Sequence, residues 1–93
     1  MISKKLNTIR IKLDKVDDQL LKVLKKRTLL VDSVIELKKF KKDIVDKKRI
    51  KKILNRVKKK SIKNKINTEI TRRIWVSMIN AYINYEFIKF KKK

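Results

Sequence analysis

The sequence predicts an all-α protein built from three helices, the first of them long, that works as an oligomer. Apolar residues recur in steps of three and four over residues 6–37, and again over residues 50–57 and 70–90. The chain of 93 residues contains no glycine and no proline, so neither residue interrupts these patterns. A chain of this length is one domain at most, and we expect that single domain to span residues 1–93. A helical core of this size buries too little apolar surface to make a single chain very stable, which favours an oligomer.

The longest apolar seam lies near the N-terminus. Its members are Leu6, Ile9, Leu13, Val16, Leu20, Val23, Leu30, Val34 and Leu37. The regular spacing predicts one helix that runs to about Phe40, with Ser3 or Asn7 as its N-cap. Arg27 occupies the one seam position that is not apolar. Because burying an unpaired guanidinium is costly, we interpret Arg27 as a charge that faces an anionic ligand.

A second, shorter helix follows a connection without periodicity. Residues 41–45 form that connection, and Asp46 is a suitable N-cap for the next helix. An apolar stripe then predicts a helix that ends near Lys60, and its members are Ile50, Ile53, Leu54 and Val57. Residues 61–66 are interpreted as a polar connection.

The third helix carries two neighbouring apolar rows. Asn67 or Thr68 can cap it, and Glu69 is favourably placed in its first turn. One row contains Ile70, Ile74, Met78, Ala81 and Tyr85, and the other contains Trp75, Ile79, Tyr82, Glu86 and Phe90. Glu86 is the anomaly, because desolvation among apolar neighbours favours its neutral form. The other interpretation is that Glu86 pairs with a lysine and extends to water.

Composition excludes several kinds of chemistry. The sequence has no cysteine and no histidine, which removes disulfides, the usual zinc sites, thiol nucleophiles and an imidazole base. The longest apolar run is three residues, as in Leu29–Val31, so neither a membrane span nor a signal-peptide core is expected. We therefore expect a cytoplasmic protein without a membrane partner.

The net charge of +21 suggests nucleic acid or an anionic membrane surface as a partner. Lysine, isoleucine and asparagine nevertheless crowd nearly every segment, as a strongly AT-rich coding bias would produce. Aromatic residues, which would stack on bases, gather near the C-terminus and do not alternate with the lysine runs. We interpret the surplus charge as background and do not expect nucleic acid to be the partner.

Three basic residues have a distinctive spacing. Lys38 follows Arg27 by eleven residues, close to three helical turns, so both project from one face about 16 Å apart along the axis. Two long side chains leaning inward could close around one small anion. Arg10 precedes Arg27 by seventeen residues, or about 25 Å, so one small ligand cannot touch both in the same straight helix.

This pattern resembles the signature of the all-helical chorismate mutases over nearly the whole chain. The matching positions are Arg10, Leu13, Asp14, Asp17, Leu20, Leu21, Leu24, Arg27, Lys38, Asp46, Arg49 and, as the acid on the third helix, Glu86. The resemblance implies a homodimer in which two chains interlock through their long first helices and form two sites. In each site Arg10 would come from the partner chain.

The reaction implied by the resemblance is the rearrangement of chorismate to prephenate, a step toward phenylalanine and tyrosine. The substrate is a small dicarboxylate, and the intramolecular reaction requires no cofactor and no metal. Arg10 and Arg27 would clamp the carboxylates. Lys38 and a protonated Glu86 would donate to the ether oxygen as its bond to carbon breaks. Asp46 and Arg49 would border the ring hydroxyl.

The sequence departs from the family pattern at two positions. Ile50 stands where the family commonly has Glu, and Tyr82 stands where a small hydroxyl residue is common. Tyr82 could supply a hydroxyl to the substrate, narrow the pocket, or serve as a core aromatic residue. The alternatives to a mutase are an isochorismate pyruvate lyase of the same fold, which the apolar Ile50 also resembles, and a non-enzymatic basic helical module that binds nucleic acid.

Overall fold

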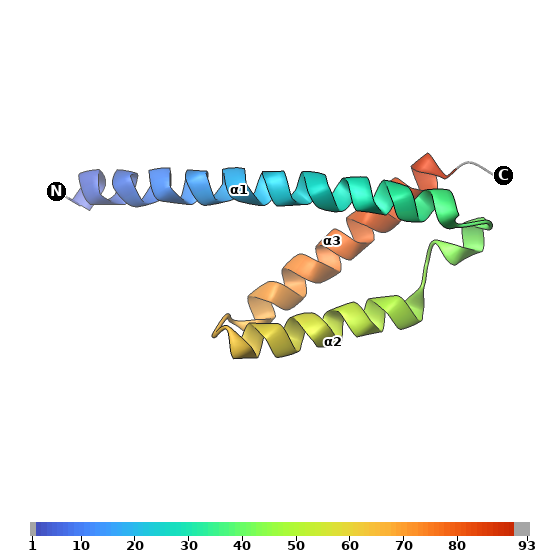
Figure 1. Cartoon of the computed structure of the whole chain (residues 1–93). Helices are drawn as coiled ribbons and strands as arrows, with labels where there is room; N and C mark the ends of the chain where they lie inside the picture. The colour runs from blue at the N-terminus through green and yellow to red at the C-terminus, as the bar shows by residue number, and fades with distance from the viewer. Residues whose placement is uncertain (1, 91–93) are drawn as a thin grey trace. The chain divides into compact units, whose positions relative to one another are not determined.

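The computed structural model describes residues 2–90, which form three α-helices and one short 3-10 turn (Figure 1). The elements are α1 (Ile2–Leu37), η1 (Lys41–Asp43), α2 (Lys47–Lys63) and α3 (Thr68–Lys89). Over residues 2–90 there is no strand, so the all-α prediction with a long first helix is confirmed. The chain divides into two compact units, Met1–Ser33 and Val34–Lys93. The expected single domain stays a prediction.

The first unit contains α1 as far as Ser33, and α1 begins at Ile2, so the expected caps Ser3 and Asn7 instead lie within the helix. Most of its large apolar side chains are exposed in the single chain, with fractions from 38% to 67%. These side chains are Leu6, Ile9, Ile11, Leu13, Val16, Leu20, Leu21, Val23, Leu24, Leu29 and Leu30. A folded chain rarely leaves so much contiguous apolar surface in water.

The end of α1 belongs to the second unit and comes three residues earlier than expected, at Leu37 instead of Phe40. The amide of Lys38 donates to the carbonyl of Ile35 at 3.1 Å, a tight final turn that does not continue the helix. Phe40 is extended, with φ −125° and ψ 142°. The connection expected over residues 41–45 then contains the 3-10 turn η1, and the side chain of Ile44 is only 3% exposed.

Helix α2 begins as predicted, because a side-chain oxygen of Asp46 accepts from the amide of Arg49 at 3.0 Å. It ends at Lys63, three residues later than expected, so Ser61 is helical and not part of a polar connection. Ser61 is buried, donates to the carbonyl of Val57 at 2.7 Å, and lies 2.8 Å from the hydroxyl of Thr71 on α3. This polar contact was invisible to apolar periodicity, and it extends the packing of the α2–α3 hairpin.

Helix α3 is capped by Asn67, whose side chain accepts from the amides of Glu69 and Ile70. One of its two apolar rows faces the interior. Ile79 and Glu86 in that row are buried, whereas Ile70 and Ile74 in the other row are more than half exposed. Glu86 therefore lies on the packed side of α3. Among the described helices, none is long and apolar enough to cross a membrane.

The connection between α2 and α3 stores a small amount of backbone strain at Lys65, which has a φ of 57°. The amide of Ile66 donates to Ser61 and that of Lys65 to Ile62, so α2 ends in a Schellman motif. Glycine is the usual residue at the left-handed position of this motif. A lysine there loses about 1 kcal/mol to the contact between its Cβ and the backbone.

Replacing Lys65 with glycine should therefore stabilise the protein. We expect Lys65→Gly to raise the free energy of unfolding by about 0.5–1 kcal/mol, the relieved strain exceeding the added freedom of the unfolded chain. Urea unfolding at fixed protein concentration measures the change. As a matched control, Lys63→Gly lies inside the last turn of α2 and should lower stability by about 1 kcal/mol. A loss of stability in both variants would contradict the strain at Lys65.

Candidate functional site

Lys38 and Glu86 are brought together by the second unit. Lys38 directly follows α1, Glu86 lies one turn before the end of α3, and the Lys38 Nζ is 3.5 Å from the Glu86 Oε1. Both side chains are largely withdrawn from water, with exposed fractions of 19% and 11%. A buried carboxylate requires a partner, and Lys38 supplies it. Glu86 thus pairs with a lysine but does not extend to water.

The ammonium of Lys38 has a second contact within the same unit. Its Nζ donates to the carbonyl oxygen of Ile44 at 3.3 Å. An ammonium carries three N–H donors, and this hydrogen bond uses one of them, while the ion pair with Glu86 holds the charge beside the carboxyl. Another N–H can approach a ligand oxygen. A cation held beside an acid in this way can stabilise negative charge that develops on such an oxygen.

An open hollow of about 670 Å³ adjoins Lys38. It is lined by Lys38, Lys42, Asp43, Val45, Asp46, Lys47 and Lys48. Asp46 is held in place by its hydrogen bond to the amide of Arg49, so the start of α2 forms one wall. The hollow is lined by more cations than carboxylates, which suits an anionic ligand. Lys42, Lys47 and Lys48 were not identified as candidate site residues from the sequence. The feature that could have identified them is their position on either side of Asp46, the N-cap of α2.

Arg49, Ile50 and Tyr82 lie on the two helices that follow Lys38. Arg49 is exposed in the first turn of α2, and Ile50 is half-buried beside it. Tyr82 is half-buried one turn before Glu86, and its ring packs edge-to-face on that of Tyr85 with 6.3 Å between the centroids. This packing is expected of a core aromatic residue. A contact between the Tyr82 hydroxyl and the substrate stays a prediction.

Arg10 and Arg27 lie on α1 in the first unit. Arg10 is exposed, whereas Arg27 has an intermediate exposure. Their separation of seventeen residues on an unbroken helix corresponds to about 25 Å. A small ligand bound by Arg27 of one chain therefore cannot also contact Arg10 of that chain.

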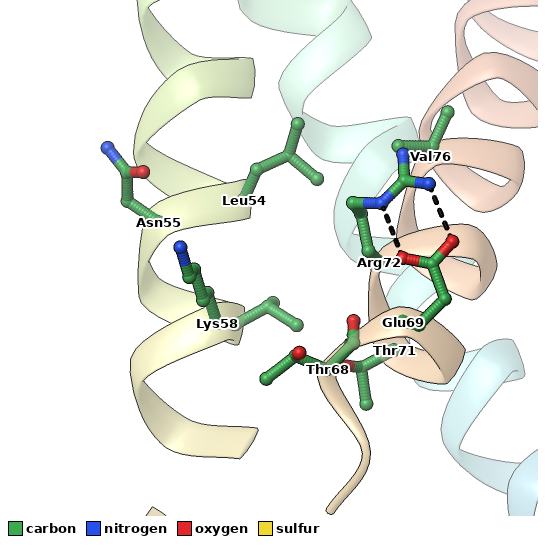
Figure 2. Close-up of a pocket in the computed structure, with 9 residues that line it drawn as sticks. Leu54, Asn55, Lys58, Thr68, Glu69, Thr71, Arg72 and Val76 are labelled. Atoms are coloured by element: carbon green, nitrogen blue, oxygen red, sulfur yellow. Dashed lines mark hydrogen bonds and ion pairs between the residues drawn. The ribbon is translucent and has the colours of Figure 1, made fainter. Parts of the chain in front are cut away.

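A second cavity, of about 380 Å³, lies between α2 and α3 (Figure 2). It is lined by Leu54, Asn55, Val57, Lys58, Thr68, Glu69, Thr71, Arg72 and Val76, and includes no predicted site residue. Figure 2 shows Arg72 and Glu69 joined by two hydrogen bonds, of 2.8 and 3.3 Å. The Arg72 guanidinium, with help from Arg73, holds the pKa of Glu69 below its ordinary value. Of the charged residues that line this cavity, Glu69 and Arg72 are thus engaged in an exposed ion pair.

Comparison with known proteins gave one match. A family model described as chorismate mutase type II matches residues 9–87. The matched region includes the seven residues singled out from the sequence: Arg10, Arg27, Lys38, Asp46, Arg49, Tyr82 and Glu86. Searches of curated proteins and of solved structures found no match.

The pairing of Lys38 with Glu86 predicts a pattern of mutant stabilities. Lys38→Met should lower the free energy of unfolding by about 1–3 kcal/mol, because it leaves the Glu86 carboxyl buried without its partner. The double variant Lys38→Met/Glu86→Met removes both polar groups and should recover part of that loss. Urea unfolding at one fixed protein concentration compares the variants. A double variant no more stable than Lys38→Met would show that the pair does not couple the two positions.

Proposed function

The chain belongs to the chorismate mutase type II family, and we propose that it catalyses the rearrangement of chorismate to prephenate. The observation that carries this proposal is the contact between the Lys38 ammonium and the Glu86 carboxyl at 3.5 Å, both largely withdrawn from water. In this proposal the enzyme acts in the cytoplasm, on the route to phenylalanine and tyrosine, and uses no cofactor.

The reaction breaks one carbon–oxygen bond of the ether bridge and forms one carbon–carbon bond within the same molecule. No atom enters or leaves, so the protein need supply neither a nucleophile nor a redox group. It has to hold the compact conformer and stabilise the negative charge that grows on the ether oxygen. Lys38 donates one N–H to this oxygen, and neutral Glu86 donates its O–H. The other Glu86 oxygen keeps its contact with the Lys38 ammonium, so both donors stay beside each other at the substrate oxygen.

The two carboxylates of the substrate are bound by arginines in this proposal, because a guanidinium forms bidentate contacts that lysine cannot copy. Arg27 binds one carboxylate, and the partner's Arg10 binds the other. Support for a second chain comes from α1, whose apolar side chains are exposed over most of its length in the single chain. Packing α1 against α1 of another copy would bury them and give an interlocked homodimer.

The ring end of the substrate would meet the start of α2. Asp46 already has its carboxylate oriented by the amide of Arg49, and it lines the open hollow beside Lys38. Asp46 and Arg49 would therefore border the ring hydroxyl, with Tyr82 on the opposite helix. The lysines of the hollow favour entry of a dianion.

A turnover assay tests the proposed function directly. The purified protein should speed the loss of chorismate absorbance and produce prephenate, and Lys38→Met should lack this activity because the ether oxygen loses its cation. Salt-sensitive retention of DNA without any turnover would favour the basic-module alternative and contradict the proposal.

Isochorismate is a second possible substrate, and the half-buried Ile50 is the specific observation in its favour. The family's common Glu would contact the ring hydroxyl, and an apolar side chain cannot. We propose that the mutase reaction still dominates, because Asp46 can meet that hydroxyl. Release of pyruvate from isochorismate, measured beside prephenate formation at equal substrate concentration, discriminates between the two.

The shared site predicts that two inactive variants can complement each other. Arg10→Ala and Arg27→Ala homodimers should each lose most activity, by about 100-fold or more, because each site lacks one carboxylate clamp. After subunit exchange, a heterodimer would hold one site with both changes and one intact site. Activity should therefore reappear on mixing, in proportion to the heterodimer measured by native mass spectrometry. Proven exchange without recovery would contradict sharing of the site.

The role of Glu86 as a donor predicts different outcomes for two substitutions. Glu86→Gln keeps a side-chain N–H that can donate to the ether oxygen, so this variant should keep most of the catalytic efficiency. Glu86→Met has no donor and should lose about 100-fold or more. Turnover of chorismate by the two variants, compared at matched folded fractions, measures the difference. Equal losses in both variants would exclude Glu86 as the donor.

A further inference from the structure

We propose that Ile44 is a positioning residue for Lys38: its buried side chain fixes the connection after α1 so that its carbonyl oxygen aims the Lys38 ammonium at the reacting oxygen. The proposal rests on the proposed function. Its geometric part concerns the ligand-free chain, and it can be tested without any turnover.

Ile44 is anchored more firmly than any other residue of its connection. Its side chain is 3% exposed, the most buried apolar side chain over residues 3–90, whereas Lys41, Lys42 and Asp43 before it are exposed. Its amide donates to the carbonyl of Lys41 at 3.2 Å and closes the 3-10 turn. The peptide groups on both sides of Ile44 are therefore restrained by burial and by the turn.

The restrained carbonyl meets a side chain that needs directing. The Lys38 Nζ lies 3.3 Å from the Ile44 oxygen and 3.5 Å from the Glu86 Oε1. A lysine side chain has four rotatable torsions along its carbon stem. An ion pair alone therefore leaves the direction of its N–H groups loosely defined. A second acceptor at a fixed point restricts the ammonium to orientations that satisfy both contacts. An N–H that is not engaged by these acceptors then points in a defined direction, which is what stabilising one oxygen atom requires.

The alternative is that Ile44 is simply a core residue. Its carbonyl would then accept from Lys38 only because a backbone carbonyl in the connection needs a hydrogen-bond donor. The two interpretations predict different effects of shortening the side chain. Shortening a core residue would affect stability alone. Shortening a positioning residue would also change the environment of the Lys38 ammonium and the rate of the chemical step, beyond the effect of equal damage elsewhere in the core. Ile79 on α3 is a matched control, because it is also an isoleucine and is 7% exposed.

The first experiment measures acylation of lysines in the ligand-free protein by a small amine-reactive ester, with each site resolved by mass spectrometry. The reference is Lys39, which is exposed and adjacent. In Ile44→Ala the acylation of Lys38 relative to Lys39 should rise about threefold or more, because local opening frees the ammonium. In Ile79→Ala the ratio should stay at the native value. An equal rise in both variants, or no rise in either, would overturn the proposal.

The second experiment compares turnover of chorismate at matched folded fractions. Ile44→Ala should lower kcat about tenfold with little change in KM, since the carboxylate clamps remain, and Ile44→Val should restore most of the rate. Ile79→Ala should lose much less. If either alanine variant fails to fold, Ile44→Val and Ile79→Val form the deciding pair in the acylation experiment. The ratio of Lys38 to Lys39 acylation should rise in Ile44→Val, by less than in the alanine variant, and should stay at the native value in Ile79→Val. No difference between the two valine variants would overturn the proposal. Equal losses of kcat at both positions would overturn the inference.

The two experiments separate failure of the inference from failure of the proposed function. A native protein without chorismate turnover contradicts the proposed function, and the acylation ratios then decide the geometric part alone. A native protein that is active, with acylation ratios unaffected by Ile44→Ala, contradicts only the role of Ile44.

Discussion

The contact between Lys38 and Glu86 is the interaction around which the candidate site of the second unit is arranged. An ammonium and a carboxyl that are only 19% and 11% exposed have to face each other, because either one alone would be withdrawn from water without a charged partner, which is costly. To satisfy this constraint, α1 has to end before Lys38, the chain has to turn at once, and α3 has to present its inner row. The same constraint makes the site asymmetric: the acid comes from a rigid helix, whereas the cation lies on a short connection.

Because the cation lies on a connection and not on a helix, the connection after α1 has to be held in place. Its composition alone suggests a less ordered segment. Residues 41–43 are two lysines and an aspartate, which usually form a solvated loop. Ile44 converts them into a 3-10 turn by burying its side chain, and Lys41 adds a cation–π contact with the ring of Phe87 at 5.9 Å. The buried isoleucine and this contact hold the turn against α3. The Ile44 carbonyl that accepts from the Lys38 ammonium therefore lies in a restrained part of the chain.

Much of this arrangement could be predicted from the sequence, and the failures have physical causes. Periodicity identified the helices, and the chemistry of capping identified Asp46 and Asn67, because both signals are local. The anomaly of Glu86 was visible as one acid in an apolar row. Periodicity could not find Ile44, since a single buried residue in a turn has no period. It also missed the helical Ser61, whose burial depends on a hydroxyl of the following helix.

In the candidate site, too, local sequence signals identified residues but not the contacts that depend on packing. The spacing related Arg27 to Lys38 on one predicted helix, but α1 ends at Leu37, before Lys38. Only packing could show that the Lys38 ammonium meets both Glu86 and the carbonyl of Ile44. The apolar seam of α1 was predicted to lie against other helices, and in the single chain it stays exposed over most of its length. In the proposed homodimer another copy of the chain would cover this exposed seam and would also supply the partner's Arg10 to the proposed site.

The central claim is that Glu86 and Lys38 form the reacting end of a dicarboxylate site, and one titration tests it most directly. The chain has only three glutamates, Glu36, Glu69 and Glu86, so labelling their carboxyl carbons with ¹³C gives three signals that Glu69→Gln and Glu86→Gln assign. The ligand is a stable bicyclic ether dicarboxylate that mimics the transition state of the rearrangement. The account predicts that the Glu86 signal moves in step with binding while those of Glu36 and Glu69 stay in place. Binding that leaves the Glu86 signal unmoved would contradict it.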